Sequence, residues 1–251
     1  MRYAILSDIH GNLEALTAVL EHLAAERIDH YYCLGDIVGY GADPGACVAR
    51  LHACEALSVG GNHDLACIGK FDLQWFNDAA RTALLWTKDQ LSVTELDSLR
   101  RLPLTEVREP FTLVHGTLPH PERFEYLMDM AQALDTVKAC RTLICLTGHT
   151  HQPCVIEYDR RQRQITRILL HAIELVEVPF SDDPETMRYI VNPGSVGQPR
   201  DGDPRASCAV IDTARRRVTL HRVSYDIKRA QQKIRHAGLP EFLAARLAVG
   251  R

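Results

Sequence analysis

Short apolar runs, each followed at once by a glycine-rich polar loop, recur along this chain. Apolar runs of four or five residues bounded by glycine are typical of buried strands. Helical patterns separate the first three runs, because Asn12 to Glu26 carries leucine and valine at helical spacing and Pro44 opens a second helix that ends at Ala53. Strands that alternate with helices predict a parallel or mixed sheet with helices packed on it. The first predicted strands are Tyr3 to Ser7, Tyr31 to Leu34 and Ala56 to Val59, and Asp43 is the predicted cap of the second helix.

After the first three strands the chain is predicted to form a helical segment, then mostly strands, and finally helices at its C-terminal end. Residues 72–102 read as a helical insertion or cap, in which Trp75 to Lys88 is one helix and Ser92 with Glu95 resembles a capping box that opens another. A helix is predicted from Met130 to Ala139, and amphipathic helices are predicted within 226–248. No repeat or linker divides the chain, so we expect a single domain over residues 1–251. The later predicted strands are Phe111 to Val114, Thr142 to Leu146, Cys154 to Tyr158, Gln164 to Leu169, Glu174 to Val178, Tyr189 to Val191, Ala206 to Ile211 and Val218 to Val223.

Composition and charge narrow the classes of function. The 251 residues are 46% hydrophobic and 24% charged, as in ordinary globular proteins. The 29 basic and 32 acidic residues give a formal net charge of -3, which argues against nucleic acid or a membrane as the partner and makes phosphate recognition a local matter. The N-terminus lacks the apolar run of a signal peptide, and the eight cysteines form no Cys-x-x-Cys pair. We therefore expect a cytoplasmic protein with buried free thiols.

The polar loops carry aspartate, asparagine and histidine directly after the predicted strands. Because the carboxyl ends of parallel strands share one edge of a sheet, we expect these loops to meet in one crevice. Imidazole nitrogens combined with carboxylate and amide oxygens suit Mn, Fe, Co or Zn. Residues at positions i and i+2 of an extended segment point the same way, which groups Asp8 with His10 and His149 with His151. The seven candidate ligands, too many for one tetrahedral ion and about right for two, are Asp8, His10, Asp36, Asn62, His115, His149 and His151.

An ordered set of motifs in these loops resembles a known family. Asp8-Ile9-His10, Gly35-Asp36, Gly61-Asn62-His63-Asp64, His115 and Gly148-His149-Thr150-His151 resemble the motifs of the calcineurin-like metallophosphoesterase superfamily. The resemblance spans residues 3 to about 223, and SDIHGNLEAL, GDIVGYGADP and NPGSVGQPRDG look closest to its bacterial branch of small predicted phosphodiesterases and phosphatases. The resemblance implies an α/β fold, a four-layer αββα sandwich of two mixed sheets with helices on both outer faces.

The resemblance also implies roles for individual residues. Asp8, His10 and His151 would bind one metal ion, Asn62, His115 and His149 would bind the other, and Asp36 would bridge the two. A metal-bridging hydroxide would then attack phosphorus in line. His63 would stabilise the phosphoryl charge or protonate the leaving oxygen, and Asp64 would fix the tautomer of His63, unless Asp64 merely caps a turn. Mn is the expected metal, with Fe, Zn, Co or Ni as alternatives.

Two further segments bear on the substrate. Asn192 to Arg200 has small residues that expose backbone N–H groups to an anion, so Arg200 is a candidate, with Asn62, for binding the substrate phosphate. The alternative is a rigid turn with Arg200 in a surface ion pair. In the insertion, aromatic residues are expected to be mainly core, with stacking on a base as the alternative for one or two of them. They are Phe71, Trp75, Phe76 and Trp86.

The function predicted from these features is hydrolysis of a small phosphodiester, nucleotide or phosphomonoester. Protein phosphatases of the superfamily carry an arginine soon after Gly-Asp and another before Gly-Asn-His, whereas this chain has Ile37 to Gly41 and Gly60 there. That departure counts against a serine/threonine protein phosphatase. The near-neutral charge counts against a nuclease, and the complete set of ligand residues counts against a non-catalytic interaction module. The oligomeric state stays open.

Overall fold

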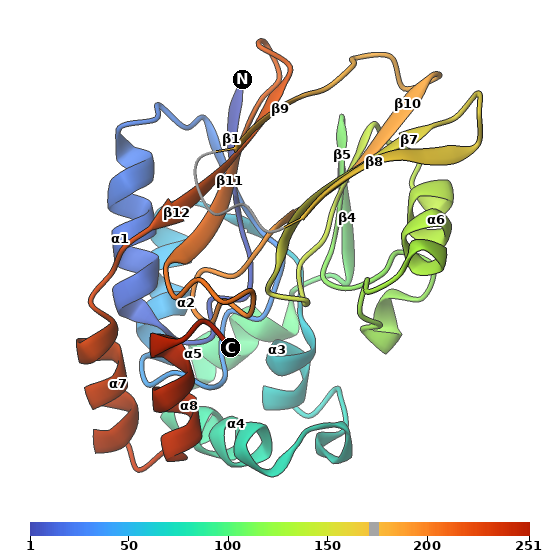
Figure 1. The fold of residues 1–251 in the computed structure, drawn as a ribbon. Coiled ribbons are helices and arrows are strands. Elements are labelled where there is room, and N and C mark those ends of the chain that lie inside the picture. Colours follow the sequence, from blue (N-terminus) through green and yellow to red (C-terminus); the bar gives the residue numbers. More distant parts are fainter. Residues whose placement is uncertain (171–175) are drawn as a thin grey trace.

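Two six-stranded sheets lie face to face in this protein (Figure 1). The computed structural model describes residues 1–170 and 176–251. The first sheet contains β1 (Arg2–Leu6), β2 (His30–Cys33), β3 (Leu57–Ser58), β9 (Val176–Pro179), β11 (Ala206–Asp212) and β12 (Arg217–Val223). The second contains β4 (Thr105–Arg108), β5 (Phe111–Val114), β6 (Ile144–Leu146), β7 (Pro153–Asp159), β8 (Gln164–Leu170) and β10 (Met187–Pro193). The strand orders are β3-β2-β1-β11-β12-β9 and β4-β5-β6-β10-β7-β8.

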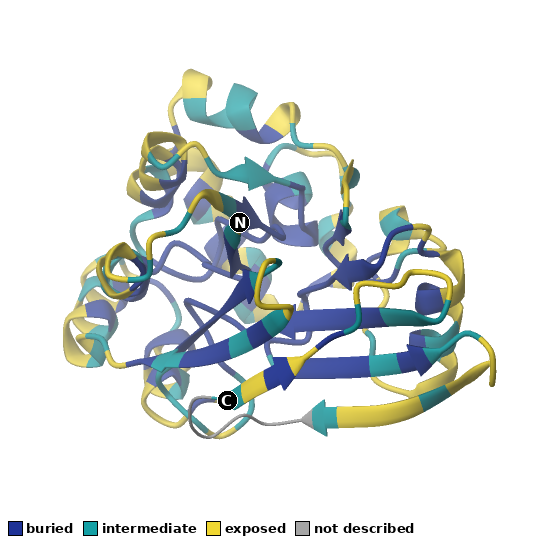
Figure 2. Ribbon diagram, turned by 90° about the horizontal axis from the view of Figure 1, so that it is seen from above, coloured by how far each residue is buried: buried dark blue, intermediate teal, exposed yellow. Residues whose placement is uncertain are grey.

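Alternating side chains place each sheet between two apolar layers. Tyr3 and Ile5 of β1 pack between the sheets, whereas Ala4 and Leu6 pack towards the helices on the outer side. Ile190 of β10 likewise belongs to the outer layer of the second sheet. Because successive side chains of a strand point to opposite faces, the central strands of both sheets are covered on two sides, whereas Figure 2 shows the edge strand β8 largely exposed. The predicted four-layer sandwich of two mixed sheets is confirmed.

Helices form the two outer layers. Helix α1 (Leu13–Ala24) packs on the first sheet, and α6 (Met130–Ala139) packs on the second. Lys233 joins three elements, since its Nζ lies 2.6 Å from Glu14 and 2.8 Å from Asp43. The remaining α-helices of the described residues are α2 (Pro44–Ala53), α3 (Asn62–Cys67), α4 (Asp78–Gln90), α5 (Val93–Arg100), α7 (Ile227–His236) and α8 (Glu241–Ala245).

The structure corrects several local predictions. The carboxylate of Asp43 makes no capping hydrogen bond to α2, because it turns to Lys233 instead. The helix predicted from Trp75 begins at Asp78, because the Asn77 side chain caps it, and Trp75 ends a short 3₁₀ helix (Leu73–Trp75). Strand β4 and helix α3 were not predicted, since both are short. Glu174, the predicted start of one strand, lies outside the described residues.

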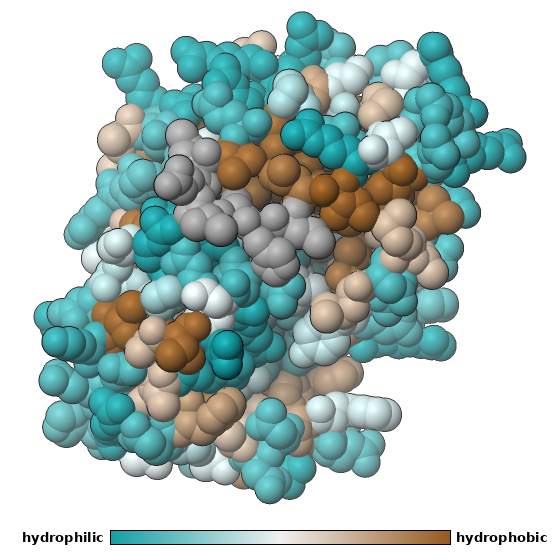
Figure 3. Space-filling model, viewed as in Figure 1, coloured by the Kyte–Doolittle hydropathy of each residue, from teal (hydrophilic) through white to brown (hydrophobic). Residues whose placement is uncertain are grey.

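The surface gives two further observations. Among the described residues, no helix is long and apolar enough to cross a membrane. The face shown in Figure 3 is mostly hydrophilic. Hydrophobic side chains gather in the upper middle of this view, where Figure 1 places the edge strand β8.

Replacing Ser92 by alanine is expected to lower the free energy of unfolding by about 1 kcal/mol. The predicted capping box is confirmed, because Ser92 Oγ accepts from the amide of Glu95 and Glu95 Oε2 accepts from the amide of Ser92. Urea unfolding measures the change. Ser98→Ala is the matched control inside the same helix, since its exposed hydroxyl donates to the carbonyl of Thr94 and accepts a long bond from Arg101, and it should change stability by less than about 0.5 kcal/mol.

Candidate metal centre

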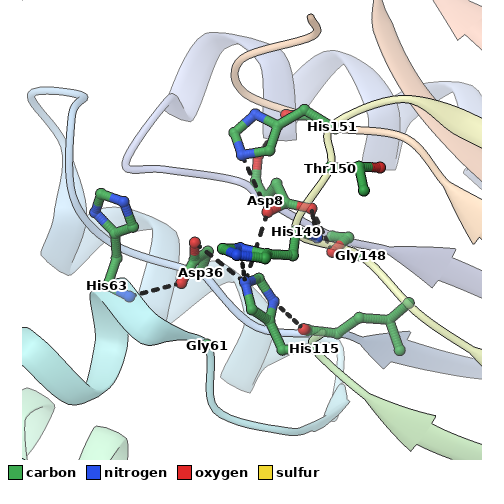
Figure 4. A network of polar contacts seen from close by, with 12 residues as sticks. Asp8, Asp36, Gly61, His63, His115, Gly148, His149, Thr150 and His151 are labelled. Carbon is green, nitrogen blue, oxygen red and sulfur yellow. Dashed lines mark hydrogen bonds and ion pairs between the residues drawn. The ribbon is translucent and has the colours of Figure 1, made fainter. Parts of the chain in front are cut away.

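Six of the seven candidate ligands meet where parallel strands of both sheets end, and Figure 4 shows Asp8, Asp36, His115, His149 and His151 among them. The seventh, Asn62, lines a cavity together with His149. Asp8 follows β1, Asp36 follows β2 and Asn62 follows β3. His115 comes directly after β5, and His149 and His151 lie in the loop after β6. The carboxyl ends belong to two facing sheets, so the loops converge between two sheet edges and not along the single edge that the strand and helix pattern predicts.

The side chains form two groups that share one carboxylate. Potential ligand atoms of Asp8, His10, Asp36 and His151 lie within 4.8 Å of one another, and so do those of Asp36, His115 and His149. All of these residues are buried. Asp36 is common to both groups. The resemblance implies Asn62 as a further ligand beside His115 and His149, and that assignment stays a prediction.

The backbone at the centre is unusual. Asp8, His10, Asp36, His149 and His151 have φ angles of 53°, 49°, 52°, 65° and 58°, in the left-handed region that residues with a side chain rarely adopt. These segments are therefore not extended, and the predicted i and i+2 alignment is the wrong explanation of their grouping. Such conformations persist only where the surrounding structure enforces them, and they cluster at functional sites.

Glycine makes two of the close approaches possible. A Cβ on Gly148 would lie 2.0 Å from Ser7 Oγ and 2.9 Å from Asp8 Oδ2, and a Cβ on Gly61 would lie 2.1 Å from Asp36 Oδ1. Neither contact leaves room for a side chain. The backbones of these loops are consequently packed directly against the two carboxylates.

Backbone carbonyl groups orient three of the imidazole rings. Nδ1 of His10 lies 3.2 Å from the carbonyl oxygen of Val38. Nδ1 of His115 lies 2.7 Å from that of Leu34, and Nδ1 of His151 lies 2.6 Å from that of Gln198. A proton on Nδ1 satisfies each of these hydrogen bonds and leaves Nε2 with a free lone pair. Such outer contacts are typical of histidines that bind metal.

The free nitrogen atoms face one another. His10 Nε2 lies 3.2 Å from His151 Nε2, and His115 Nε2 lies 3.1 Å from His149 Nδ1. With the protons on Nδ1, the lone pairs of His10 and His151 repel each other unless a cation lies between them. Oδ1 of Asp8 and Oδ1 of Asn62 are also buried without a hydrogen-bond partner. Orphaned acceptors that surround a common point fit divalent cations.

The electrostatics favour the metal-binding forms of Asp8, His10 and His149, whereas His115 is protonated until a cation displaces its proton. Burial raises the pKa of the Asp8 carboxyl, but His151 and His115 outweigh it and lower the pKa below its usual range. Burial lowers the pKa of His10, and burial together with His115 lowers that of His149. For His115, burial is outweighed by Asp36, which raises the pKa to about 9. Most of the site is thus neutral imidazole around ionised carboxylate.

Asp64 does not fix the tautomer of His63, so this predicted role is wrong. Its carboxylate accepts from the backbone N–H groups of Ile37 at 2.9 Å, Val38 at 3.2 Å and Gly61 at 3.1 Å. His63 Nδ1 has no hydrogen-bond partner. Both residues lie in the first turn of α3, and consecutive side chains of a helix do not face each other. Burial and Asp36 raise the pKa of the Asp64 carboxyl to about 7. Asp64 anchors two loops, as the turn-capping alternative foresaw.

Replacing Asp64 by asparagine is expected to lower the free energy of unfolding by about 3 kcal/mol. Asparagine could keep its oxygen on the amides of Ile37 and Val38, but its NH₂ group would then face the N–H of Gly61, so two buried donors would oppose each other and lose their acceptor. Urea unfolding of the metal-free protein isolates this effect. Asp226→Asn is the control, because Asp226 caps α7 through one exposed bond to the amide of Arg229 and should cost less than about 1 kcal/mol. Equal effects of the two substitutions would contradict an anchoring role.

His63 lies beside the two groups and is held by aromatic rings. Its ring centroid is 4.4 Å from that of Tyr40, 4.7 Å from that of His10 and 4.9 Å from that of Phe76. Its backbone N–H donates to Asp36 Oδ1 at 2.8 Å. Burial lowers the pKa of His63 to about 4, so the ring is neutral and supplies one N–H donor.

Most N–H groups of the loop from Asn192 to Arg200 have acceptors within the protein, so the loop is not the predicted row of N–H groups exposed to an anion. Those of Val196 and Gly197 donate to the carbonyls of Ser7 and Asp8, and that of Gln198 donates to Ser195 Oγ. The loop instead braces the segment that carries Asp8.

Arg200 is not in a surface ion pair, which was the alternative to phosphate binding. Its guanidinium donates to Gln198 Oε1 at 2.8 Å and lies 5.8 Å from the ring centroid of Tyr40. No carboxylate of the described residues pairs with Arg200 within 4 Å. Its charge reaches the centre, since it contributes to lowering the pKa of His63 and His151.

An open cavity adjoins the centre, and one of its walls could not be predicted from the sequence. It has a volume of about 540 Å³ and is lined by Asn62 and His149 together with residues of the insertion and of the segment before α6. The ring of Tyr126 stacks on that of His149, with centroids 3.8 Å apart and planes 15° apart. Tyr126 was missed because it lies in an irregular segment without a motif. Outside the cavity lining, burial and the nearby Arg200 lower the pKa of Arg246 to about 10.

Comparison with known proteins identifies the class of this fold and site. Residues 1–216 match the calcineurin-like phosphoesterase superfamily domain, so the chain belongs to this family. It is 40% identical over 252 residues to an uncharacterized protein of Methanocaldococcus jannaschii, covering 99% of this chain and 98% of that protein.

Two solved structures share the fold over the whole chain. The metallophosphoesterase of Sphaerobacter thermophilus is 42% identical, with a TM-score of 0.84, and the match covers 100% of this chain and 99% of that one. A hypothetical protein of Pyrococcus horikoshii OT3 is 22% identical, with a TM-score of 0.75 over 100% of this chain and 98% of that one, and shows the fold alone. The family and the buried Asp and His cluster together indicate a metal-binding protein of the phosphoesterase class.

Proposed function

We propose that this protein hydrolyses a small phosphodiester or phosphomonoester, including nucleotides, with two divalent metal ions, Mn²⁺ first among them. The observation that carries the proposal is the pair of buried ligand groups that share Asp36. Asp8, His10 and His151 would hold one ion, and Asn62, His115 and His149 the other. Ions held there would supply Lewis acidity to the ester oxygens and activate water as the nucleophile.

The residues of the chain have separate tasks in this proposal. Backbone carbonyls hold the protons of His10, His115 and His151 on Nδ1, so that Nε2 stays directed at the ions. His63, neutral and held by Tyr40, donates a hydrogen bond to the phosphoryl oxygens as charge builds on them. Arg200 supplies a fixed positive charge at the edge of the site.

Substrates of low molecular weight fit the rest of the molecule better than polymers do. The formal net charge is -3, so no general positive field attracts nucleic acid. The partner is therefore a small phosphorylated molecule, with neither nucleic acid nor a membrane involved.

The proposal is tested by hydrolysis of bis-p-nitrophenyl phosphate and p-nitrophenyl phosphate by metal-stripped protein, with and without Mn²⁺. Mn²⁺-dependent release is expected, and the ratio of the two rates assigns diester or monoester preference. A narrower substrate range is covered by adding a panel of nucleotides and sugar phosphates with phosphate detection. Absence of release from every compound in the presence of Mn²⁺ would overturn the proposal.

A further inference from the structure

The cavity beside the metal centre has aromatic walls. Phe71 and Trp75 come from the segment between α3 and α4, and Phe124 and Tyr126 come from the segment before α6. The rings of Phe71 and Phe124 meet edge to face with centroids 5.1 Å apart. Figure 1 shows the two segments on the same side of the molecule. A volume of about 540 Å³ lies within the range of small-molecule sites.

Trp75 has no packing role that explains it. Its side chain is 73% exposed, whereas Phe76, the next residue, is 7% exposed and belongs to the core. The prediction that Trp75 is mainly core is therefore wrong. A tryptophan that lines a cavity and still faces solvent offers a flat apolar surface to a ligand.

The cavity is continuous with the proposed metal ligands. Asn62 and His149 line it, and Tyr126, 44% exposed, stacks on the imidazole of His149. A molecule whose phosphate lies at the metal centre therefore has its ester group within reach of the aromatic walls.

The charges that line the cavity favour an uncharged ester substituent over a second phosphate group. Glu122, Arg123 and Glu125 line the cavity and contribute two negative charges and one positive. Arg123 lies 3.9 Å from Glu125, so its charge is already engaged. A second anionic group would be repelled here, whereas an uncharged planar ring would not.

We propose that this cavity binds a planar aromatic group carried by the phosphate ester, with Trp75 and Tyr126 as its stacking surfaces. The inference rests on the proposed function and names its substrate class as esters with an aromatic or nucleobase substituent. Trp75 and Tyr126 are specificity residues, since they contact the substituent and not the phosphorus.

Two non-hydrolysable ligands that differ only in the ring test the inference by calorimetry on the Mn²⁺-loaded protein. Phenylphosphonate is expected to bind about tenfold more tightly than methylphosphonate, because stacking on one aromatic side chain has an effect of that order. In Trp75→Ala the dissociation constants of the two phosphonates should differ by less than about threefold, whereas Trp75→Phe should keep most of the tenfold difference. Leu85→Ala, an exposed apolar residue of the same insertion, should leave it unchanged.

A nucleobase is distinguished from a simple aryl group by the phosphonate analogue of AMP, compared with the same analogue lacking adenine. Adenine should add at least as much affinity as phenyl if the natural substituent is a base, and less if it is a smaller ring.

Tryptophan fluorescence gives a second readout of stacking. Trp75 and Trp86 are the two tryptophans of the chain, so in Trp86→Phe the emission of the Zn²⁺-loaded protein reports on Trp75. The adenine analogue is expected to quench it.

Equal binding of phenyl- and methylphosphonate to the wild type, or a ratio that Trp75→Ala leaves intact, would overturn the inference. Failure of both phosphonates to bind would overturn it as well. These readouts need no turnover. Discrimination that persists without any hydrolysis would therefore count against the proposed function and leave the aromatic subsite standing.

Discussion

Replacing Asp36 by asparagine is expected to reduce Mn²⁺-dependent hydrolysis by about a thousandfold or more. Asp36 is the one residue common to both ligand groups. Its Oδ2 lies 3.3 Å from His115 Nε2 and 3.6 Å from His10 Nε2, while its Oδ1 accepts from the amide of His63. Asparagine would keep its oxygen on that amide and turn its NH₂ group towards the imidazoles. A lone pair and a negative charge would be replaced by donors at the point that two cations would share.

The measurement is the rate of p-nitrophenol release at saturating Mn²⁺, with bound metal counted on the same samples. Asp36→Asn should fold, as judged by circular dichroism, and hold fewer ions than the wild type. Asp78→Asn makes the same chemical change at a side chain that is 98% exposed and should retain full activity. A rate for Asp36→Asn above a tenth of the wild-type rate would be incompatible with a shared carboxylate at the reacting centre.

The layered fold and the placement of the loops at the strand ends could be predicted because they depend on repeated signals. The residues that follow β1 and β2 lie at one edge of the first sheet because those strands are parallel, and those that follow β5 and β6 lie at one edge of the second sheet for the same reason. That the two edges meet depends on how the sheets face each other, which strand pairing alone does not decide. The alternation of Tyr3 and Ile5 with Ala4 and Leu6 likewise fixes two buried faces.

The geometry inside the loops could not be predicted in the same way. The left-handed conformations of Asp8 and His149 are imposed by tertiary contacts, such as the amide of His149 that donates to Asp8 Oδ2 at 3.0 Å. The spacing of Asn62, His63 and Asp64 gave no indication that a helix begins there. That helix turns Asp64 away from His63 and towards the loop after β2.

The aromatic residues show a third limit. Phe76 and Trp75 are neighbours with similar hydrophobicity, yet one is core and the other exposed. Their difference depends on the 3₁₀ helix that ends at Trp75 and on the loop that carries Tyr126. Composition identifies such residues as candidates, and only packing decides between core and ligand surface.

Removing the metal ions is expected to lower the free energy of unfolding by about 4 kcal/mol for each ion when Mn²⁺ is supplied at about a thousand times its dissociation constant. The stripped centre keeps Asp8 and Asp36 buried, and it holds the lone pairs of His10 and His151 3.2 Å apart. Cations relieve both conditions only in the folded state, because the ligands come together only there. The midpoint of thermal unfolding should therefore rise with Mn²⁺ concentration and return after chelation.

Single substitutions separate the two ions. His151→Ala removes a ligand from the group with Asp8, and His149→Ala removes one from the group with His115, so each variant should bind one Mn²⁺ tightly and keep about half of the stabilisation. Calorimetry gives the stoichiometry, and His236→Ala, an exposed residue of α7, should match the wild type. If both variants lost every ion together, the groups would act as one site. If neither lost an ion, the metal ions would bind elsewhere and the pairing of ligands around Asp36 would be incorrect.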